Sequence, residues 1–379
     1  MHFSLTEEQT AIQDMALNFA KERIAPGASE WDETAHFPMD VIRETAGLGM
    51  ATIYVPAEQG GSGLSRLDGA LIFEALSYGC PAIASYISIH NMVAWMIDGY
   101  GSDAQRAEWI PTLSTMEQLG SYCLTEPGAG SDAAALATRA VRDGDDYVIN
   151  GTKQFISGAG TSAIYVVMAR TADTGSRGIT AILVPDGTPG LSFGPLEKKM
   201  GWHAQPTRQV IFEDVRVPVA NRLAEESDGF GIAMNGLNGG RLNIGACSLG
   251  GGQAALDATV DYVKTREAFG GPLIDQQAIL FELADMDTKL EAARTLLARA
   301  AQALDDGDAD KVRLCAMAKR VATDAGFEVA NSAIQLHGGY GYLSEYGLER
   351  IVRDLRVHQI LEGTNEIMRL IVGRSLVGK

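Results

Sequence analysis

The runs Ala163-Ile164-Tyr165-Val166-Val167-Met168 and Ile179-Thr180-Ala181-Ile182-Leu183-Val184 lie in the middle of the 379-residue chain and are rich in β-branched and apolar residues. The turn dipeptides Asn150-Gly151 and Pro189-Gly190 stand on either side of them. Short apolar runs bounded by such turns are typical of strands rather than helices. The sequence therefore predicts that residues 121–228 form a compact antiparallel sheet or barrel.

Helical periodicity is found on both sides of this segment. Thr6 and Gln9 have the spacing of a capping box, and apolar residues then recur at intervals of three and four. After about residue 229 the helical period returns in Asp275 to Leu304, Asp310 to Leu336 and Leu361 to Leu376. We therefore expect an α+β multidomain fold with an N-terminal α-helical domain (1–120), a middle antiparallel β-barrel (121–228) and a C-terminal α-helical bundle (229–379).

The chain is acidic, with 48 Asp and Glu residues against 31 Lys and Arg and a formal charge of −17. Such a field repels nucleic acid and anionic lipid, so neither is an expected partner, and a polyanionic substrate would need locally placed arginines. No run approaches the roughly 18 apolar residues that span a bilayer, and the first eight residues lack the apolar segment of a secretion signal. We expect no membrane insertion, and a protein that is cytoplasmic or, as a processed eukaryotic form, in the mitochondrial matrix.

The four cysteines are far apart in the sequence and form no Cys-x-x-Cys pair. A zinc site or a disulfide framework is therefore not expected, and no metal is predicted. Small, buried, apolar positions are the expected role of Cys80, Cys123, Cys247 and Cys315.

A glycine-rich segment begins the middle region, where residues 122–132 read Tyr-Cys-Leu-Thr-Glu-Pro-Gly-Ala-Gly-Ser-Asp. Its glycines would let backbone N–H groups approach a flat or anionic ligand. It is not the dinucleotide fingerprint, because G-x-G-x-x-G and a following helix are absent. Taken alone, an ordinary surface turn is the simpler interpretation.

Four further motifs follow this segment: Phe155-Ile156-Ser157-Gly158, Arg266-Glu267-Ala268-Phe269-Gly270, Gln335-Leu336-His337-Gly338-Gly339-Tyr340-Gly341 and Ile360-Leu361-Glu362-Gly363-Thr364. In this order and spacing they resemble the acyl-CoA dehydrogenase family, from the start of the middle segment to the carboxyl end. The resemblance implies a helical domain, a β-barrel and a helical bundle, in the same order as the periodicity predicts. It also implies FAD as cofactor, an acyl-CoA substrate, an electron-transferring flavoprotein as electron acceptor, and a homotetramer built as a dimer of dimers.

By the same resemblance, FAD would lie at a subunit interface, with the Phe155 ring against the flavin and the Ser157 hydroxyl reaching N5. One subunit would contact FAD through Tyr122, Leu124, Thr125, Gly130, Ser131, Phe155, Ile156 and Ser157. The neighbouring subunit would contribute Arg266, Phe269, Gln276, Gln277, Gln335, Leu336, Gly338 and Gly339, and two further predicted contacts are Thr364 and Glu366. From the residues alone, Gly338-Gly339 could simply end a helix, and Arg266 could be a solvated charge.

Glu362 is the predicted catalytic base. The resemblance implies that its carboxylate takes a proton from Cα of an acyl thioester while a hydride leaves Cβ for the flavin, and that its backbone N–H helps to polarise the carbonyl. In an apolar, water-poor cavity the pKa of a glutamate rises toward the basicity that this step requires. Without that context, an exposed glutamate at a loop-to-helix junction would be the simpler interpretation.

A second position bears on the base. Some members of the family carry it immediately before the arginine that is Arg241 here, but this chain has Gly240 at that place. Gly239 and Gly240 in a helix cost roughly 1 kcal/mol each relative to Ala, which suggests that space is needed, either for a branched acyl chain or for close helix packing. The resemblance implies substrate contacts at Ser131, Asn238, Gly240, Arg241, Gly363 and Arg374.

Residues 236–244 and 352–366 resemble members of the family that oxidise a short, branched acyl-CoA in amino-acid breakdown. Thr364 departs from those members, which tend to carry Ser there. Butyryl-, propionyl- and 2-methylbutyryl-CoA are alternatives, because one methylene in an apolar pocket changes binding by only about 1–3 kcal/mol. An acyl-CoA oxidase is less favoured because its typical chain has an extra C-terminal domain, and Glu362 disfavours a non-catalytic CoA-binding relative.

Overall fold

The computed structural model describes residues 4–378. Its amino-terminal part consists of the helices α1 (Glu7–Phe19), α2 (Ala28–Thr34), α3 (Met39–Glu44), α4 (Arg66–Gly79), α5 (Pro81–Tyr100) and α6 (Asp103–Ser114). The capping box predicted at the start of α1 is confirmed, since Thr6 and Gln9 exchange two hydrogen bonds of 3.1 Å. The same arrangement begins α4 and α6.

The middle sheet contains β1 (Gly120–Cys123), β2 (Arg139–Asp143), β3 (Asp146–Ser157), β4 (Ile164–Arg170), β5 (Ile179–Pro185), β6 (Leu191–Phe193), β7 (Thr207–Pro218) and β8 (Arg222–Leu223). The order is β6-β7-β3-β2-β4-β5-β8, with β1 beside β4. Most pairs are antiparallel, as predicted. The β1–β4 and β2–β4 pairs are parallel, so the prediction of a wholly antiparallel sheet was wrong. The reason is that the β2–β3 hairpin lies between β1 and β4 in the chain, and it brings the chain back to the end of the sheet at which β1 began. Within residues 4–378 no pairing joins β6 to β8, so these strand pairings do not close the sheet into a barrel.

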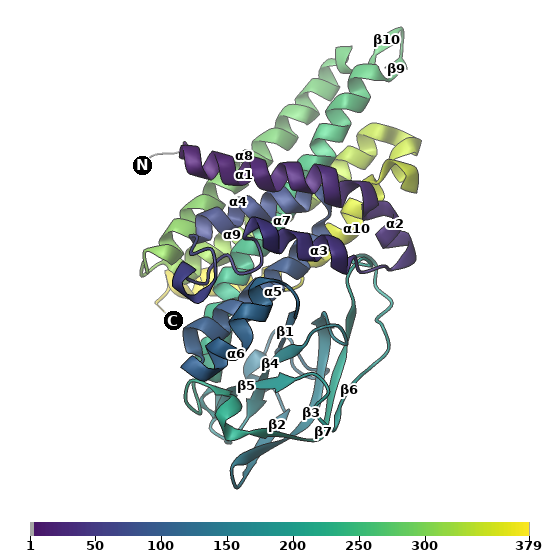
Figure 1. Ribbon diagram of the computed structural model, residues 1–379. Coiled ribbons are helices and arrows are strands. Elements are labelled where there is room, and N and C mark those ends of the chain that lie inside the picture. Colours follow the sequence, from purple (N-terminus) through teal and green to yellow (C-terminus); the bar gives the residue numbers. More distant parts are fainter. Residues whose placement is uncertain (1–3, 379) are drawn as a thin grey trace.

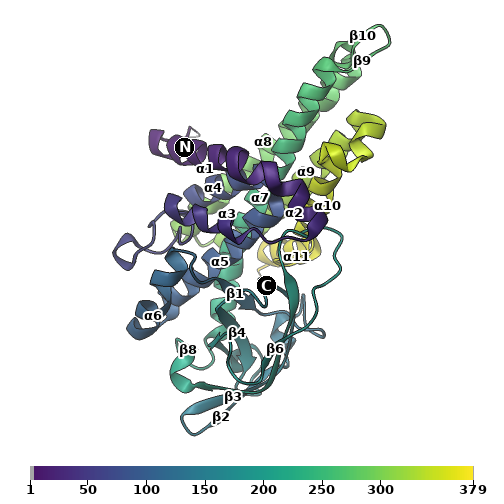
Figure 2. The same cartoon turned by 45° about the vertical axis from the view of Figure 1, so that its right-hand side comes forward.

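The carboxyl-terminal part consists of α7 (Gly229–Thr265), the hairpin β9 (Glu267–Ala268) and β10 (Gly271–Pro272), α8 (Gln277–Asp305), α9 (Lys311–His337), α10 (Leu348–His358) and α11 (Asn365–Leu376). The predicted helical segments agree with α8, α9 and α11, although α11 begins four residues after Leu361. Figure 1 and Figure 2 show the helices gathered on one side of the sheet, with the β9–β10 hairpin at the far end of the molecule.

The long helix α7 packs against α4, α5, α8 and α9 and is buried over much of its length. Glycines allow this close approach. A Cβ built on Gly250 would lie 1.9 Å from the backbone oxygen of Glu74 in α4, and one on Gly252 would lie 3.1 Å from Cα of Gly326 in α9. In this half of α7, glycine therefore serves helix packing.

Each of the four cysteines is buried, as predicted. Across the described residues, no helix is long and apolar enough to cross a bilayer. The same residues include no group of three or more His, Cys, Asp or Glu side chains that could hold a metal ion.

Candidate active site

Glu362 lies in the loop between α10 and α11 with a strained backbone. Its φ is +56°, in the left-handed region that costs a non-glycine residue free energy, and Gly363 follows with φ +88°. Two consecutive positive φ values interrupt the helix, which explains why α11 begins at Asn365. Such a conformation persists only where the surrounding structure holds it.

Two buried cations hold this loop. Lys319, in α9, donates to the Gly363 carbonyl and to the Asn365 side chain, at 2.9 Å each. Arg241, in α7, donates to the carbonyl of Glu362 at 3.3 Å. The backbone that carries Glu362 is thus fixed from two helices. Lys319 was not predicted from the sequence; a lysine on the apolar face of an amphipathic helix is the signal that could have identified it.

The Glu362 carboxylate is enclosed beside α7. A Cβ built on Gly240 would lie 2.6 Å from Glu362 Oε2. This oxygen is shielded from solvent and has no hydrogen-bond partner within residues 4–378. Burial raises the pKa of Glu362 to about 7, although the positive charges of Arg241 and Lys319 act to lower it. The predicted rise in the pKa is confirmed, and the group can act as a general base near neutral pH.

A second buried polar atom points to a ligand space beside this carboxylate. The Tyr122 hydroxyl, on β1 of the sheet, also has no hydrogen-bond partner in the described part of the chain. Burial, together with the charge of Glu362, raises the pKa of Tyr122 well above its usual value. Buried polar groups usually have partners. These two atoms, from different parts of the fold, are free to bind a ligand held between the sheet and the helical bundle.

The glycine-rich loop is supported by a buried ion pair. Lys153, in β3, donates to Glu126 Oε1 at 2.8 Å and to the Leu124 carbonyl at 3.0 Å. The same carboxylate accepts the backbone N–H groups of Ala137 (2.6 Å) and Thr138 (2.9 Å). Breaking a buried pair of this kind typically costs about 3–5 kcal/mol, so the loop is held in one shape. That rigidity argues against an ordinary surface turn.

Phe155, near the end of β3, is strained and exposed. Its φ is +59° and the residue is 63% exposed, where a bulge between Lys153 and Ile156 interrupts the pairing with β7. In the glycine-rich loop, a Cβ on Gly128 or Gly130 would meet no described atom within 4 Å. An unpacked aromatic ring and an open glycine backbone suit a flat ligand such as the predicted flavin.

Other predicted FAD contacts have more ordinary surroundings. The side chains of Leu124 and Ile156 are buried in hydrophobic clusters, so a contact there would have to use the backbone. The Thr364 hydroxyl accepts the amide of the residue three positions on and caps α11. Glu366 is exposed and pairs with Arg369 at 2.9 Å. Thr125 is partly buried, and Ser131 is exposed.

The second group of predicted FAD contacts lies far from the first within one chain. A surface hollow of about 400 Å³ is lined by Arg266, Gln335, Leu336, Gly338 and Gly339, among others. Phe269, in the β9–β10 turn, is 93% exposed, and Figure 2 shows this hairpin at the opposite end of the molecule from the sheet. Gln276 and Gln277, at the start of α8, are also exposed. One chain therefore does not bring the two groups together, an arrangement compatible with a cofactor shared between subunits.

Gly338 also has a local role. It follows the last residue of α9 with φ +59°, so it ends this helix, as the simpler interpretation held. Arg266 is exposed and lies over the Tyr340 ring, with its guanidinium carbon 5.2 Å from the ring centroid. Neither local role prevents a cofactor contact.

The predicted substrate contacts fall into two sets. Asn238, Gly240, Arg241 and Gly363 gather around Glu362, and Arg241 donates to Asn238 Oδ1 at 2.8 Å. Ser131 and Arg374 lie at the surface instead, and Arg374 lines a hollow of about 340 Å³ with Arg313. The first set of predicted substrate contacts therefore lies around Glu362, whereas Ser131 and Arg374 are not brought next to it.

The two glycines of α7 before Arg241 make room for side chains. The atoms nearest to a Cβ on Gly240 are those of the Glu362 carboxylate, and those nearest to a Cβ on Gly239 belong to the Arg66 guanidinium. At Gly239 the contact is with Arg66, the first residue of α4, so packing of a neighbouring helix accounts for this glycine, whereas at Gly240 the nearest atoms are those of Glu362. The absence of a side chain at Gly240 leaves space for the Glu362 carboxylate.

A strained, buried glutamate with a pKa near neutrality and a divided site that suits a flat ligand, on helices around a sheet, fit a flavin-dependent oxidoreductase. The chain belongs to the acyl-CoA dehydrogenase family. The family's N-terminal domain matches residues 6–117, its middle domain residues 121–215 and its C-terminal domain residues 227–377.

Individual relatives cover nearly the whole chain. It is 54% identical over 373 residues to the mitochondrial isobutyryl-CoA dehydrogenases of Bos taurus and Dictyostelium discoideum, covering 98% of this chain and 90% of each relative. It also matches a chain in a structure described as the electron transferring flavoprotein of Acidaminococcus fermentans, with a TM-score of 0.97, 40% identity and full coverage of both chains. A glutaryl-CoA dehydrogenase from Mycobacterium smegmatis in complex with FADH2 gives a TM-score of 0.94 at 29% identity, covering 99% of this chain and 96% of that one.

Proposed function

We propose that this protein removes two hydrogens from a short, branched acyl-CoA, with isobutyryl-CoA as the preferred substrate, to give the 2-enoyl-CoA. The observation that carries the proposal is Glu362, held in a strained loop beside Gly240 with a pKa of about 7. The likeness to two isobutyryl-CoA dehydrogenases supports the choice of substrate. An oxidoreductase acting on a CH–CH bond is the resulting class of enzyme.

The protein's own groups carry the proton and orient the substrate. Glu362 accepts the Cα proton, and its backbone, fixed by Arg241 and Lys319, places the carboxylate at one position. Arg241 and Asn238 are proposed to contact the acyl end, while Ser131 and Arg374 would contact the CoA portion. Bound FAD supplies the acceptor for the Cβ hydride. The proton and the hydride together balance the oxidation of a single bond to a double bond.

The FAD is proposed to be shared between two copies of the chain. Its flavin would lie against Phe155, Ser157 and the glycine-rich loop of one subunit, and the hollow beside Arg266 and Gly338 of the neighbour would complete the site. The distance between these two groups within one chain supports this arrangement. A homotetramer, closure of the middle sheet as a barrel, domain boundaries near residues 120 and 228, and an electron-transferring flavoprotein as acceptor belong to the same proposal.

The test of this function is an anaerobic titration. The purified protein is expected to be yellow, and isobutyryl-CoA should bleach its flavin band at roughly 450 nm, as flavin reduction does in general. Butyryl-, propionyl- and 2-methylbutyryl-CoA serve as comparisons, because the alternative is a dehydrogenase of straight or longer short chains. Faster bleaching by one of them would reassign the substrate, and no bleaching by any short acyl-CoA would overturn the dehydrogenase proposal. Oxygen consumption during turnover would indicate an oxidase.

The pH profile of the reaction should report Glu362. Because burial raises its pKa to about 7, the base is protonated below that pH, and kcat/KM should rise with pH to a plateau above a midpoint near 7. In Lys319→Met the midpoint should move to higher pH, because the positive charge of Lys319 lowers this pKa. Stopped-flow flavin reduction between pH 5.5 and 9 measures both midpoints. Identical midpoints in the two proteins would show that another group limits the rate.

A further inference from the structure

The loop between β6 and β7 is attached to the helix that leads to the catalytic base. The backbone amide of Trp202 donates to Asp354 Oδ1 at 2.6 Å, and its indole N–H donates to His358 Nε2 at 3.3 Å. His358 is the last residue of α10, and the loop that carries Glu362 follows it. This part of the β6–β7 loop therefore has a fixed position relative to the base.

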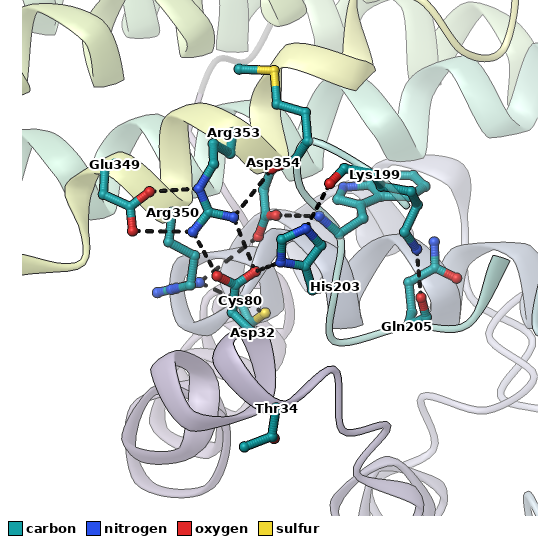
Figure 3. A network of polar contacts seen from close by, with 12 residues as sticks. Asp32, Thr34, Cys80, Lys199, His203, Gln205, Glu349, Arg350, Arg353 and Asp354 are labelled. Atoms are coloured by element: carbon teal, nitrogen blue, oxygen red, sulfur yellow. Dashed lines mark hydrogen bonds and ion pairs between the residues drawn. The ribbon is translucent and has the colours of Figure 1, made fainter. Parts of the chain in front are cut away.

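Lys199, in the same β6–β7 loop, is bonded to residues at and just before the start of β7. Its ammonium group donates to the Gln205 carbonyl at 2.7 Å and to the Thr207 hydroxyl at 2.8 Å. Figure 3 shows the hydrogen bond from Lys199 to Gln205 and, beside it, the ion pair that joins Arg353 in α10 to Asp32 in α2. The backbone of Gln205 is held at its carbonyl by Lys199 and at its amide, which donates to the Trp202 carbonyl at 3.3 Å.

The side chain of Gln205 makes one hydrogen bond and leaves one atom without a partner. The residue is 1% exposed, and its Nε2 donates to the Ser157 hydroxyl oxygen at 3.3 Å. Its Oε1 is buried and bonds to no group between residues 4 and 378. A buried amide oxygen without a partner destabilises the fold relative to an apolar side chain of the same shape. Stability therefore does not explain this glutamine, whereas its contact with Ser157 could.

We propose that Gln205 is a positioning residue that directs the Ser157 hydroxyl proton toward the cofactor; this rests on the proposed function, in which Ser157 reaches flavin N5. A serine hydroxyl has one proton and two acceptor lone pairs. The amide N–H of Gln205 occupies a lone pair of the oxygen, so the proton of Ser157 points to another acceptor. In this arrangement the Ser157 hydroxyl donates to the flavin, and Gln205 fixes the direction of that hydrogen bond before the reaction begins. Donors oriented in advance in this way stabilise charge that develops during a reaction.

Gln205→Met tests this orientation because it keeps the length of the side chain and removes its donor. The absorption spectrum and the midpoint potential of the bound flavin, measured without any acyl-CoA, should both differ from those of the parent. Flavin reduction by substrate in a single turnover should slow by about tenfold or more. The melting temperature should hardly change, since the lost amide also carried the unpartnered oxygen.

Ser157→Ala and the double variant show whether the effect passes through Ser157. If Gln205 acts through this hydroxyl, Gln205→Met should add nothing to the spectral change or the rate loss of Ser157→Ala. Full additivity would overturn the proposal. A spectral change in Ser157→Ala without one in Gln205→Met would overturn it as well. No change in Ser157→Ala would instead contradict the cofactor contact in the proposed function.

Gln105→Met is a matched control for losing a buried glutamine. Gln105 donates to the carbonyls of Ala220 and Arg222, at 2.9 and 3.1 Å, and belongs to the capping box of α6. This variant should therefore lower the melting temperature and leave the flavin spectrum unchanged, the opposite of Gln205→Met. If Gln205→Met does not fold, Gln205→Leu removes the donor with a smaller apolar side chain; it should give the same spectral change, and an unchanged spectrum would overturn the proposal.

Discussion

Glu362→Gln is expected to retain FAD and to lower kcat by about 10⁴-fold, because an amide of almost the same size cannot accept a proton. The carboxylate that is lost has a pKa of about 7, and its Oε2 has no hydrogen-bond partner among the described residues, so the replacement breaks no hydrogen bond at that oxygen. Flavin content from the visible spectrum and single-turnover flavin reduction give the two measurements.

Glu117→Gln provides the comparison for this variant. Glu117 is exposed in the connection between α6 and β1, and its substitution makes the same chemical change. It should leave both FAD content and kcat near those of the parent. If Glu362→Gln turned over at a rate near that of Glu117→Gln, the base would have to be another residue.

Gly240→Ala is expected to lower kcat by roughly 10²-fold with little loss of stability. The new Cβ would lie 2.6 Å from Oε2 of Glu362, which is the end of a flexible side chain, so the carboxylate can rotate away instead of the helices moving apart. A displacement of about 1 Å at a reacting group can cost about 10²-fold in rate. Turnover with isobutyryl-CoA and thermal unfolding test the two parts of this expectation.

Gly231→Ala on the same helix separates this effect from helix propensity. Gly231 is exposed near the start of α7, and a Cβ built on it would meet no described atom within 4 Å. The substitution should raise stability by up to about 1 kcal/mol and leave kcat unchanged. Equal losses of activity in the two alanine variants would show that the space beside Gly240 is not needed by the base.

The sequence predicted much of the architecture because helices and strands have local signals. The capping box at Thr6 and Gln9 and the apolar runs of β4 and β5 each depend on a few neighbouring residues. The parallel pairing of β1 with β4 has no such signal. It is decided by the path of the chain through the β2–β3 hairpin.

Some features of the candidate site were likewise predictable from local sequence, and others were not. Glu362 was predicted from its own motif, and its raised pKa from the expectation of an apolar cavity. The bond from Lys319 to Gly363 and the contact of Gly240 with the base join residues that are far apart in the sequence, so no local pattern contains them. The choice between acyl-chain space and helix packing at Gly240 was open for this reason, and the nearest atoms proved to be those of Glu362 itself.

By itself, the sequence determined the order of helices, strands and helices, the family, and the glutamate proposed as the base, because periodicity and motifs are carried by neighbouring residues. Tertiary structure alone decided the strained backbone of Glu362 and the value toward which its pKa moves. It also decided the bond from Gln205 to Ser157. These properties depend on burial and on distances between groups from different elements, which exist only once the chain has packed.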